Sequence, residues 1–235
     1  MTAAQRLRLT AAFAAAGIAL GATACSSSGG TAANGGALGY DRFRSTALDV
    51  FKHKTDTCPF GLDFAKAATA AGITGAVAPA EHDGHSVSGN AGDGVPAQPW
   101  PSGVTHPPSQ PEMPAVPPSA EITCTYTVGR SAVDVHLMAA SKSDYGLSMM
   151  LPKIAAAGLL STDQLSRFFA DRPAIGQTRL TPGDGTAAVS RVALSGEGDL
   201  ILLLSQNTIG NPPQDEALSG EPLRKAAEAL AAQLR

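Results

Sequence analysis

Aromatic and charged residues are both scarce in this chain. Phe, Tyr and Trp make up 5% of its 235 residues, with a single Trp, and Asp, Glu, Lys and Arg make up 16%. This composition excludes a core built mainly from large aromatic side chains. We therefore expect Ala, Val and Leu, which are often fully buried in folded proteins, to fill the interior.

The chain also lacks an excess of positive charge. It has 17 Lys and Arg residues against 20 Asp and Glu residues, a formal net charge of −3. Domains that bind nucleic acid usually carry a basic face that neutralises phosphates. We therefore expect no nucleic-acid partner.

Long apolar runs are missing beyond the first 24 residues. The longest are Ile154–Leu160 and Leu200–Leu204. A membrane-spanning helix needs roughly 20 apolar residues. We expect no such helix in this part of the chain, so any membrane attachment has to come from a lipid.

Cysteine is rare, and the first of three cysteines follows an export signal. Arg6 and Arg8 precede a mostly apolar stretch, Thr10–Leu20, and Ala22-Thr23-Ala24 then leads to Cys25. This is the three-part pattern of a bacterial secretory signal. The triplet before Cys25 is similar to the lipobox of bacterial lipoproteins, in which the cysteine thiol receives a diacylglycerol group.

The prediction is a signal peptide over residues 1–24, a lipidated Cys25 and a flexible tether up to residue 39. The tether is rich in Ser, Gly, Ala, Thr and Asn, a composition typical of flexible linkers. Two acyl chains are enough for stable anchoring, so the expected location is the extracytoplasmic face of the cell membrane. Ordinary secretion after cleavage at the same triplet stays open as an alternative.

The remaining cysteines, Cys58 and Cys124, form an even pair in an exported chain. Thiols oxidise in that compartment, so such a pair indicates a structural disulfide. A redox or metal-binding pair would favour a Cys-x-x-Cys spacing, which the sequence lacks. We expect the disulfide.

Proline is concentrated in one segment. Ten of the 17 prolines lie between Pro79 and Pro118, among Gly, Ser and His. Each proline fixes φ and removes a backbone donor, which disfavours both helices and strands. We predict a disordered insertion over residues 79–119 within a single domain that spans residues 40–235.

The rest of the chain has a clear hydrophobic pattern. Helical spacing of apolar residues occurs in five segments: one that begins near Asp41, one that begins near Pro59, Tyr145–Ala157, Thr162–Ala170, and one that begins near Leu223. Alternation, or a short apolar run, predicts five strands: Ile122–Val128, Val133–Leu137, Ile175–Leu180, Ala187–Leu194 and Asp199–Ser205. The unbroken Leu200–Leu204 indicates a strand covered on both faces. The expected fold class is α+β, with helices packed on an antiparallel sheet of about five strands.

The order of these features resembles a known group of proteins. The features are the lipobox at Cys25, the polar tether, Cys58 before a short helix, the strand with Cys124-Thr125-Tyr126, the turn Pro182–Gly185 and a final helix rich in Ala and Leu. They resemble the small actinobacterial lipoproteins of unknown function that are related to the extracytoplasmic sensor domain of mycobacterial serine/threonine kinases. The resemblance covers residues 56–78 and 120–234. It implies that the two cysteines pair and that the chain is an envelope-facing binding or sensing module.

Candidates for catalysis are few. Asp134 and His136 alternate onto the same face of one predicted strand, where they could serve as an orienting acid and a general base. A nucleophile is missing, because no Gly-x-Ser-x-Gly or Ser-x-x-Lys motif occurs. Polar residues on one face of a strand are also typical of the solvated side of a sheet.

A metal site is an equally weak hypothesis. His82 and His85 stand three positions apart inside the insertion, where His106 or Glu112 could supply a third ligand. Ordering a structureless loop around a metal costs on the order of 1 kcal/mol for each residue. We therefore expect a solvated loop, and no metal or other cofactor.

These observations predict a membrane-anchored, non-catalytic module that binds a cell-envelope component, a small ligand or a partner protein. A hydrolase that acts on envelope polymers through Asp134 and His136 is the alternative. An enzyme should show a pocket where these two side chains meet a hydroxyl group, and a binding module a groove lined by residues such as Tyr126 and Tyr145. In a third interpretation, the insertion is a spacer that spans peptidoglycan.

Overall fold

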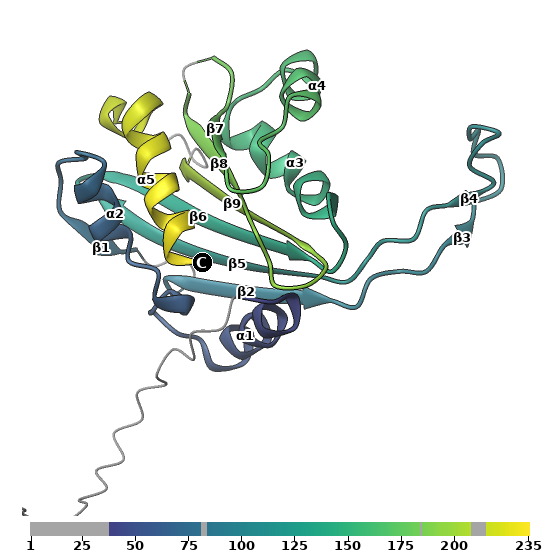
Figure 1. The fold of residues 1–235 in the computed structure, drawn as a ribbon, viewed down its shortest axis with the longest axis horizontal. Coiled ribbons are helices and arrows are strands. Elements are labelled where there is room, and N and C mark those ends of the chain that lie inside the picture. Colours follow the sequence, from purple (N-terminus) through teal and green to yellow (C-terminus); the bar gives the residue numbers. More distant parts are fainter. Residues whose placement is uncertain (1–37, 81–83, 184, 208–214) are drawn as a thin grey trace, which may run out of the picture. The chain divides into compact units, whose positions relative to one another are not determined.

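An antiparallel sheet of seven strands organises the protein (Figure 1). The structure is a computed structural model that describes residues 38–80, 84–183, 185–207 and 215–235. The strands of the sheet are β1 (Val77–Pro79), β2 (Val87–Gly92), β5 (Ser119–Val128), β6 (Ser131–Ala140), β7 (Thr178–Leu180), β8 (Ala187–Val192) and β9 (Asp199–Gln206). Their order is β1-β5-β6-β9-β8-β7, and β2 also pairs with β5. The predicted α+β class is confirmed, with more strands than expected.

Within the described ranges, five α-helices pack on this sheet. They are α1 (Tyr40–His53), α2 (Phe64–Ala70), α3 (Tyr145–Ala157), α4 (Thr162–Ala170) and α5 (Gly220–Gln233). The bounds of α3 and α4 agree with the sequence pattern, and Ser161 and Gln164 form a capping box at the start of α4. Across the described ranges, no helix combines the length and the apolar character that crossing a membrane requires.

The helices form two layers, one on each face of the sheet. On β9, Leu202 packs in a core cluster with α1, α2 and α5, whereas its neighbour Leu203 packs in a second cluster with α3 and α4. Successive side chains of a strand point to opposite faces, so the two clusters lie on opposite sides. We call the side of α1, α2 and α5 the first face and the side of α3 and α4 the second face. All five residues of Leu200–Leu204 are fully buried, as predicted.

A disulfide joins Cys58 to Cys124 on the first face, with their Cα atoms 5.8 Å apart. It ties the segment between α1 and α2 to the middle of β5. The predicted pairing is thus present in the structure. Cys25 and the predicted signal peptide lie outside the described residues.

The proline-rich segment departs from the prediction of continuous disorder. Its first part forms β2, which pairs with β5 from Val87 opposite Cys124 to Gly92 opposite Ser119. No proline lies within β2, so its residues keep their backbone donors, and Val87 adds to the core of the first face. Residues 93–118, which we call the arm, continue this strand pair beyond the sheet (Figure 1). Within the arm, β3 (Gln98–Pro99) pairs with β4 (Glu112–Met113).

The second predicted helix is divided in two. A 3₁₀ turn, Pro59–Gly61, contains Phe60 at φ 62° and is separated from α2 by two residues. The side chain of Asp63 accepts a hydrogen bond from the backbone of Lys66 at 2.8 Å and begins α2. The spacing of apolar residues does not reveal a positive φ. The sequence analysis therefore predicted one helix where the structure has a 3₁₀ turn followed by α2.

Candidate functional site

Asp134 and His136 lie side by side on the second face, as the alternation of their strand predicted. Three further polar side chains surround them: Glu121 and Thr123 from the neighbouring strand β5, and Lys153 from α3. We call these five residues the polar cluster. The three ionisable strand residues are largely buried, because the side chains of Glu121, Asp134 and His136 are only 13%, 12% and 16% exposed.

His136 is the centre of the polar cluster. Its Nδ1 atom lies 2.9 Å from the Thr123 hydroxyl oxygen, so the two share a hydrogen bond. The same ring nitrogen is 3.7 Å from Glu121 Oε1, and Nε2 is 4.0 Å from Asp134 Oδ2. The strand register explains the first contact, since Thr123 and His136 are direct cross-strand partners.

Glu121 and Lys153 form the strongest ion pair of the cluster, with 2.6 Å between Glu121 Oε1 and Lys153 Nζ. Burial raises the pKa of the Glu121 carboxyl, but the adjacent His136 and Lys153 outweigh it and hold that pKa below its usual value. Glu121 therefore stays charged. The pair connects α3 to β5, whereas the apolar cluster that contains α3 is formed with residues of β6, β8 and β9.

The arrangement differs from an activated nucleophile. A catalytic triad needs a hydrogen bond between the base and its orienting acid. The separation of 4.0 Å between Asp134 and His136 is too long for such a bond. The expected hydroxyl group is present as Thr123, a residue that the sequence reasoning did not consider, because its link to His136 depends on strand register.

The predicted aromatic groove is not formed. Tyr126 packs against Phe64 on the first face, with ring centroids 5.1 Å apart. Burial and, to a lesser extent, Asp63 raise the pKa of Tyr126 to about 12, so it stays protonated. Tyr145 begins α3, and its hydroxyl donates to the Ala115 carbonyl at 3.5 Å, at the base of the arm. The two tyrosines therefore belong to different surfaces.

A buried ion pair that the sequence analysis missed attaches α3 to the sheet. Arg191 of β8 donates to Asp199 Oδ1 of β9 from Nε at 3.2 Å and from an Nη at 3.0 Å. The same Nη contacts Asp144, which precedes α3, at 2.9 Å. Asp199 Oδ2 accepts from the backbone of Leu147 at 3.3 Å. A charged Arg191 in a short strand made otherwise of Ala, Val and Ser was the available signal. Because these groups form hydrogen bonds with one another, we assign the network a structural role.

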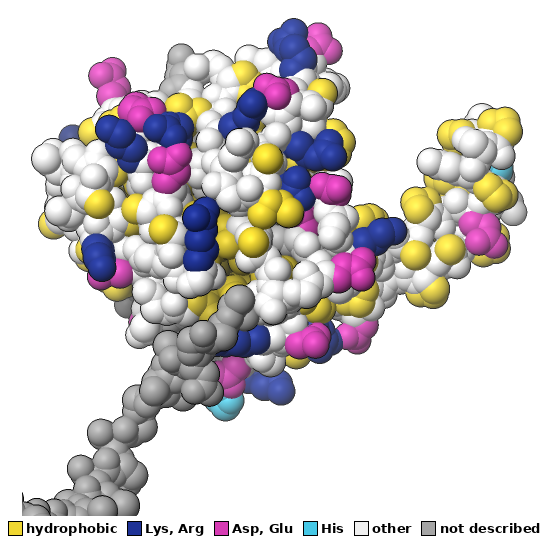
Figure 2. Space-filling model, viewed as in Figure 1, with side chains coloured by type: hydrophobic (Ala, Val, Ile, Leu, Met, Phe, Trp, Pro, Cys, Tyr) yellow, Lys and Arg dark blue, Asp and Glu magenta, His cyan; other side chains and the backbone are white. Residues whose placement is uncertain are grey.

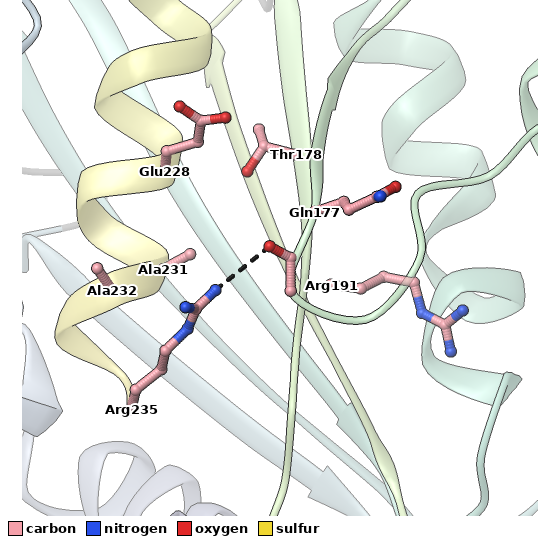
Figure 3. A pocket seen from close by; sticks show the side chains of 8 residues that line it. Gln177, Thr178, Arg191, Glu228, Ala231, Ala232 and Arg235 are labelled. Carbon is pink, nitrogen blue, oxygen red and sulfur yellow. Dashed lines mark hydrogen bonds between the residues drawn. The ribbon is translucent and has the colours of Figure 1, made fainter.

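A groove of about 230 Å³ lies between α5 and the segment that leads into β7. We call it the α5 groove. Glu228 and Arg235 border it on one side, with Ala231 and Ala232 between them, and Gly176 and Thr178 face them (Figure 3). Arg235 donates to the Gly176 carbonyl at 3.3 Å. Gln177 and Arg191 also line the groove, but their side chains turn away from α5 (Figure 3).

The weak metal hypothesis gains no support. His82 lies outside the described residues, and His85 is half-buried beside β2. His106 stacks on Trp100 with ring centroids 5.5 Å apart. Among the residues that the structure describes, no three His, Cys, Asp or Glu side chains gather closely enough to hold a metal ion.

Comparison with known proteins adds no relative: no family model matches the chain, and neither a curated protein nor a solved structure is significantly similar to it.

Proposed function

We propose that this protein is a lipid-anchored, non-catalytic binding module on the extracytoplasmic face of the cell membrane. Its arm, residues 93–118, makes the contact with a partner protein of the envelope. The lipid anchor at Cys25 rests on the sequence pattern before it. The single observation that carries the binding function is the arm, an ordered projection that contributes nothing to the core.

Contacts within the arm hold its two chain segments together, and its base also contacts α1 through the Arg44–Asp93 ion pair and α3 through the hydrogen bond from Tyr145 to Ala115. Val95 and Val116 exchange two backbone hydrogen bonds of 2.8 Å, and Trp100 Nε1 donates to the Gln110 carbonyl at 2.8 Å near the tip. No described residue of the arm is buried in the core, and Val95, Val104 and Val116 are 46%, 46% and 38% exposed. A long ordered loop of this kind is usually functional.

The chemistry of the arm favours a protein partner. Nine of its residues are prolines, and it contains no Lys or Arg. Figure 2 shows hydrophobic side chains along it and no Lys or Arg. Proline-rich extended segments bind aromatic-lined grooves of proteins at low entropic cost. A bilayer with anionic lipids attracts basic side chains, which the arm lacks.

Site-specific photocrosslinking in the native envelope tests this function. A photoreactive amino acid at position 104, near the arm tip, should form one discrete protein adduct. The control position is Leu159, which is 73% exposed and lies outside the arm, in the connection between α3 and α4. An equal adduct pattern from both positions, or lipid adducts alone from position 104, would contradict a protein contact made by the arm.

A shortened variant separates binding from folding. Because Gly92 and Ser119 are direct partners in the β2–β5 pair, an Asn-Gly turn between them can close the hairpin without the arm. We expect this variant to unfold at the same urea concentration as the parent and to lose the crosslink. Metabolic labelling with an alkyne fatty acid tests the anchor separately, and Cys25→Ser should abolish the label.

The hydrogen bond between Thr123 and His136 favours a second candidate function, a hydrolase with Thr123 as its nucleophile. Asp134 would then have to approach His136 by about 0.8 Å or more from its separation of 4.0 Å. A fluorophosphonate probe distinguishes the two functions. Labelling that disappears in Thr123→Val would establish the enzyme, and we expect no labelling of the intact chain.

A further inference from the structure

We propose that the α5 groove is a binding site for a small zwitterion, namely an amino acid or a short peptide with free termini. This site is independent of the arm. The proposal rests on two opposite charges at the ends of the groove, on small side chains between them, and on the size of the space.

Arg235 supplies the positive end. Its guanidinium carries five N–H donors. Among the described residues, it donates one hydrogen bond, to the Gly176 carbonyl. Figure 3 shows this guanidinium directed into the groove, where the dashed line marks its hydrogen bond to the Gly176 carbonyl. Several donors remain for a ligand, and a guanidinium fork binds a carboxylate through two parallel hydrogen bonds.

Glu228 supplies the negative end. Arg224, one turn earlier on α5, pairs with Oε1 of Glu228, which leaves Oε2 for another donor. The carboxylate points towards Thr178 on the opposite wall (Figure 3). An ammonium group at this end would meet the free carboxylate oxygen and the Thr178 hydroxyl, which already shares a hydrogen bond of 2.7 Å with Ser190.

The space between the two charges suits one or two amino-acid residues. Glu228 and Arg235 are seven positions apart, on the order of 10 Å along a helix axis, and their flexible side chains shorten this span. A dipeptide extends over about 7 Å. The volume of about 230 Å³ lies below the roughly 300–1,000 Å³ of drug-sized ligand pockets. Ala231 and Ala232 leave room for the ligand backbone.

An NMR titration of the whole ¹⁵N-labelled chain with L-alanyl-L-alanine tests the site. We expect saturable shifts of the Gly176, Thr178 and Ala232 amides. N-acetylation or C-terminal amidation of the dipeptide should each weaken binding about tenfold or more, because each removes a charged hydrogen bond. Equal affinity for the blocked peptides would overturn the proposal, as would the absence of shifts at millimolar dipeptide.

Four variants assign the charges. Glu228→Gln and Arg235→Gln should each weaken dipeptide binding about tenfold or more. Glu216→Gln, in the 3₁₀ turn Glu216–Leu218 before α5, and Lys225→Gln on α5 change exposed charges outside the groove and should bind as the parent does. The amide spectrum of each variant checks its fold. Loss of binding in all four variants would contradict the assignment. Unchanged binding in both Glu228→Gln and Arg235→Gln would contradict it as well. Crosslinking through the arm is unaffected by either result.

Discussion

The two faces of the sheet are covered in different ways. Three helices cover the first face, where apolar side chains fill the contact and the Cys58–Cys124 disulfide joins the covering layer to β5. On the second face, α3 and α4 pack over β6, β8 and β9. The second-face side chains of β5, including Thr123 and Thr125, stay half-buried, with charged neighbours.

The two faces therefore differ in what they contribute to the protein. The first face holds most of the apolar core, so changes there should act on folding. The second face combines an apolar half with a polar half, and a buried ion pair between Arg191 and Asp199 holds α3 in place. Four predictions compare the two faces, beginning with the largest expected effect.

Removal of the disulfide should cost most. Replacing Cys58 and Cys124 by Ala frees a loop with a sequence separation of 66, which in the chain-entropy model lowers the free energy of unfolding by about 4 kcal/mol. Urea denaturation measures this loss. A drop below about 1 kcal/mol would show that packing alone holds the first face together.

Arg191→Ala should destabilise the second face by about 3 kcal/mol, because it leaves the buried Asp199 carboxylate without its partner. Hydrogen exchange should accelerate first at the Leu147 amide, which donates a hydrogen bond to Asp199. The double variant Arg191→Met/Asp199→Leu, which removes both charges, should recover much of the loss. Equal destabilisation of the single and double variants would mean that the ion pair itself, and not charge burial, determines the effect.

Adjacent leucines of β9 compare the packing of both faces directly. Leu202→Ala opens a cavity on the first face and Leu203→Ala on the second, and both residues are fully buried. We expect each to lower the free energy of unfolding by about 3 kcal/mol. Thr125→Ala, on the open half of the second face, should change it by less than about 0.5 kcal/mol. A much smaller loss for Leu203 would show that α3 and α4 pack loosely.

Apart from the Thr125→Ala control, Glu121→Gln should have the smallest effect, and one that depends on pH. The folded pKa of Glu121 is lowered, so its charge stabilises the fold above the unfolded pKa, and this stabilisation is lost as pH falls through the folded pKa. At neutral pH we expect a loss of about 1 kcal/mol. The difference between parent and variant should shrink as the pH falls below the unfolded glutamate pKa of about 4.3. If the difference in the free energy of unfolding did not depend on pH, Glu121 would stabilise the fold by something other than its charge.

Local patterns predicted much of the fold. The apolar periodicity located α3 and α4 to the residue, because each helix is long enough for its spacing to be unambiguous and Ser161 caps α4. The same reasoning failed at Phe60, whose positive φ no spacing reveals. It also failed at β2, since the proline count of the whole segment concealed six residues that contain none.

The candidate sites were harder to predict. Alternation placed Asp134 and His136 on one face, but their contacts with Thr123 and Glu121 depend on the register of β5 against β6. Lys153 enters the cluster only because α3 docks over β6 and β9. The α5 groove joins residues near 176 with residues near 230, and no motif in either segment points to the other.

Features that depend on a few neighbouring residues could thus be predicted from the sequence. They are the strand Leu200–Leu204, which is buried on both faces, most of the helices, and the pairing of Cys58 with Cys124. Their physical cause is local, since periodicity and composition decide which side chains leave water. The polar cluster, the ion pair of Arg191 and the α5 groove came from the folded arrangement. Strand register and helix docking are set by the packing of the whole core, and they alone bring distant charges within a few ångströms of one another.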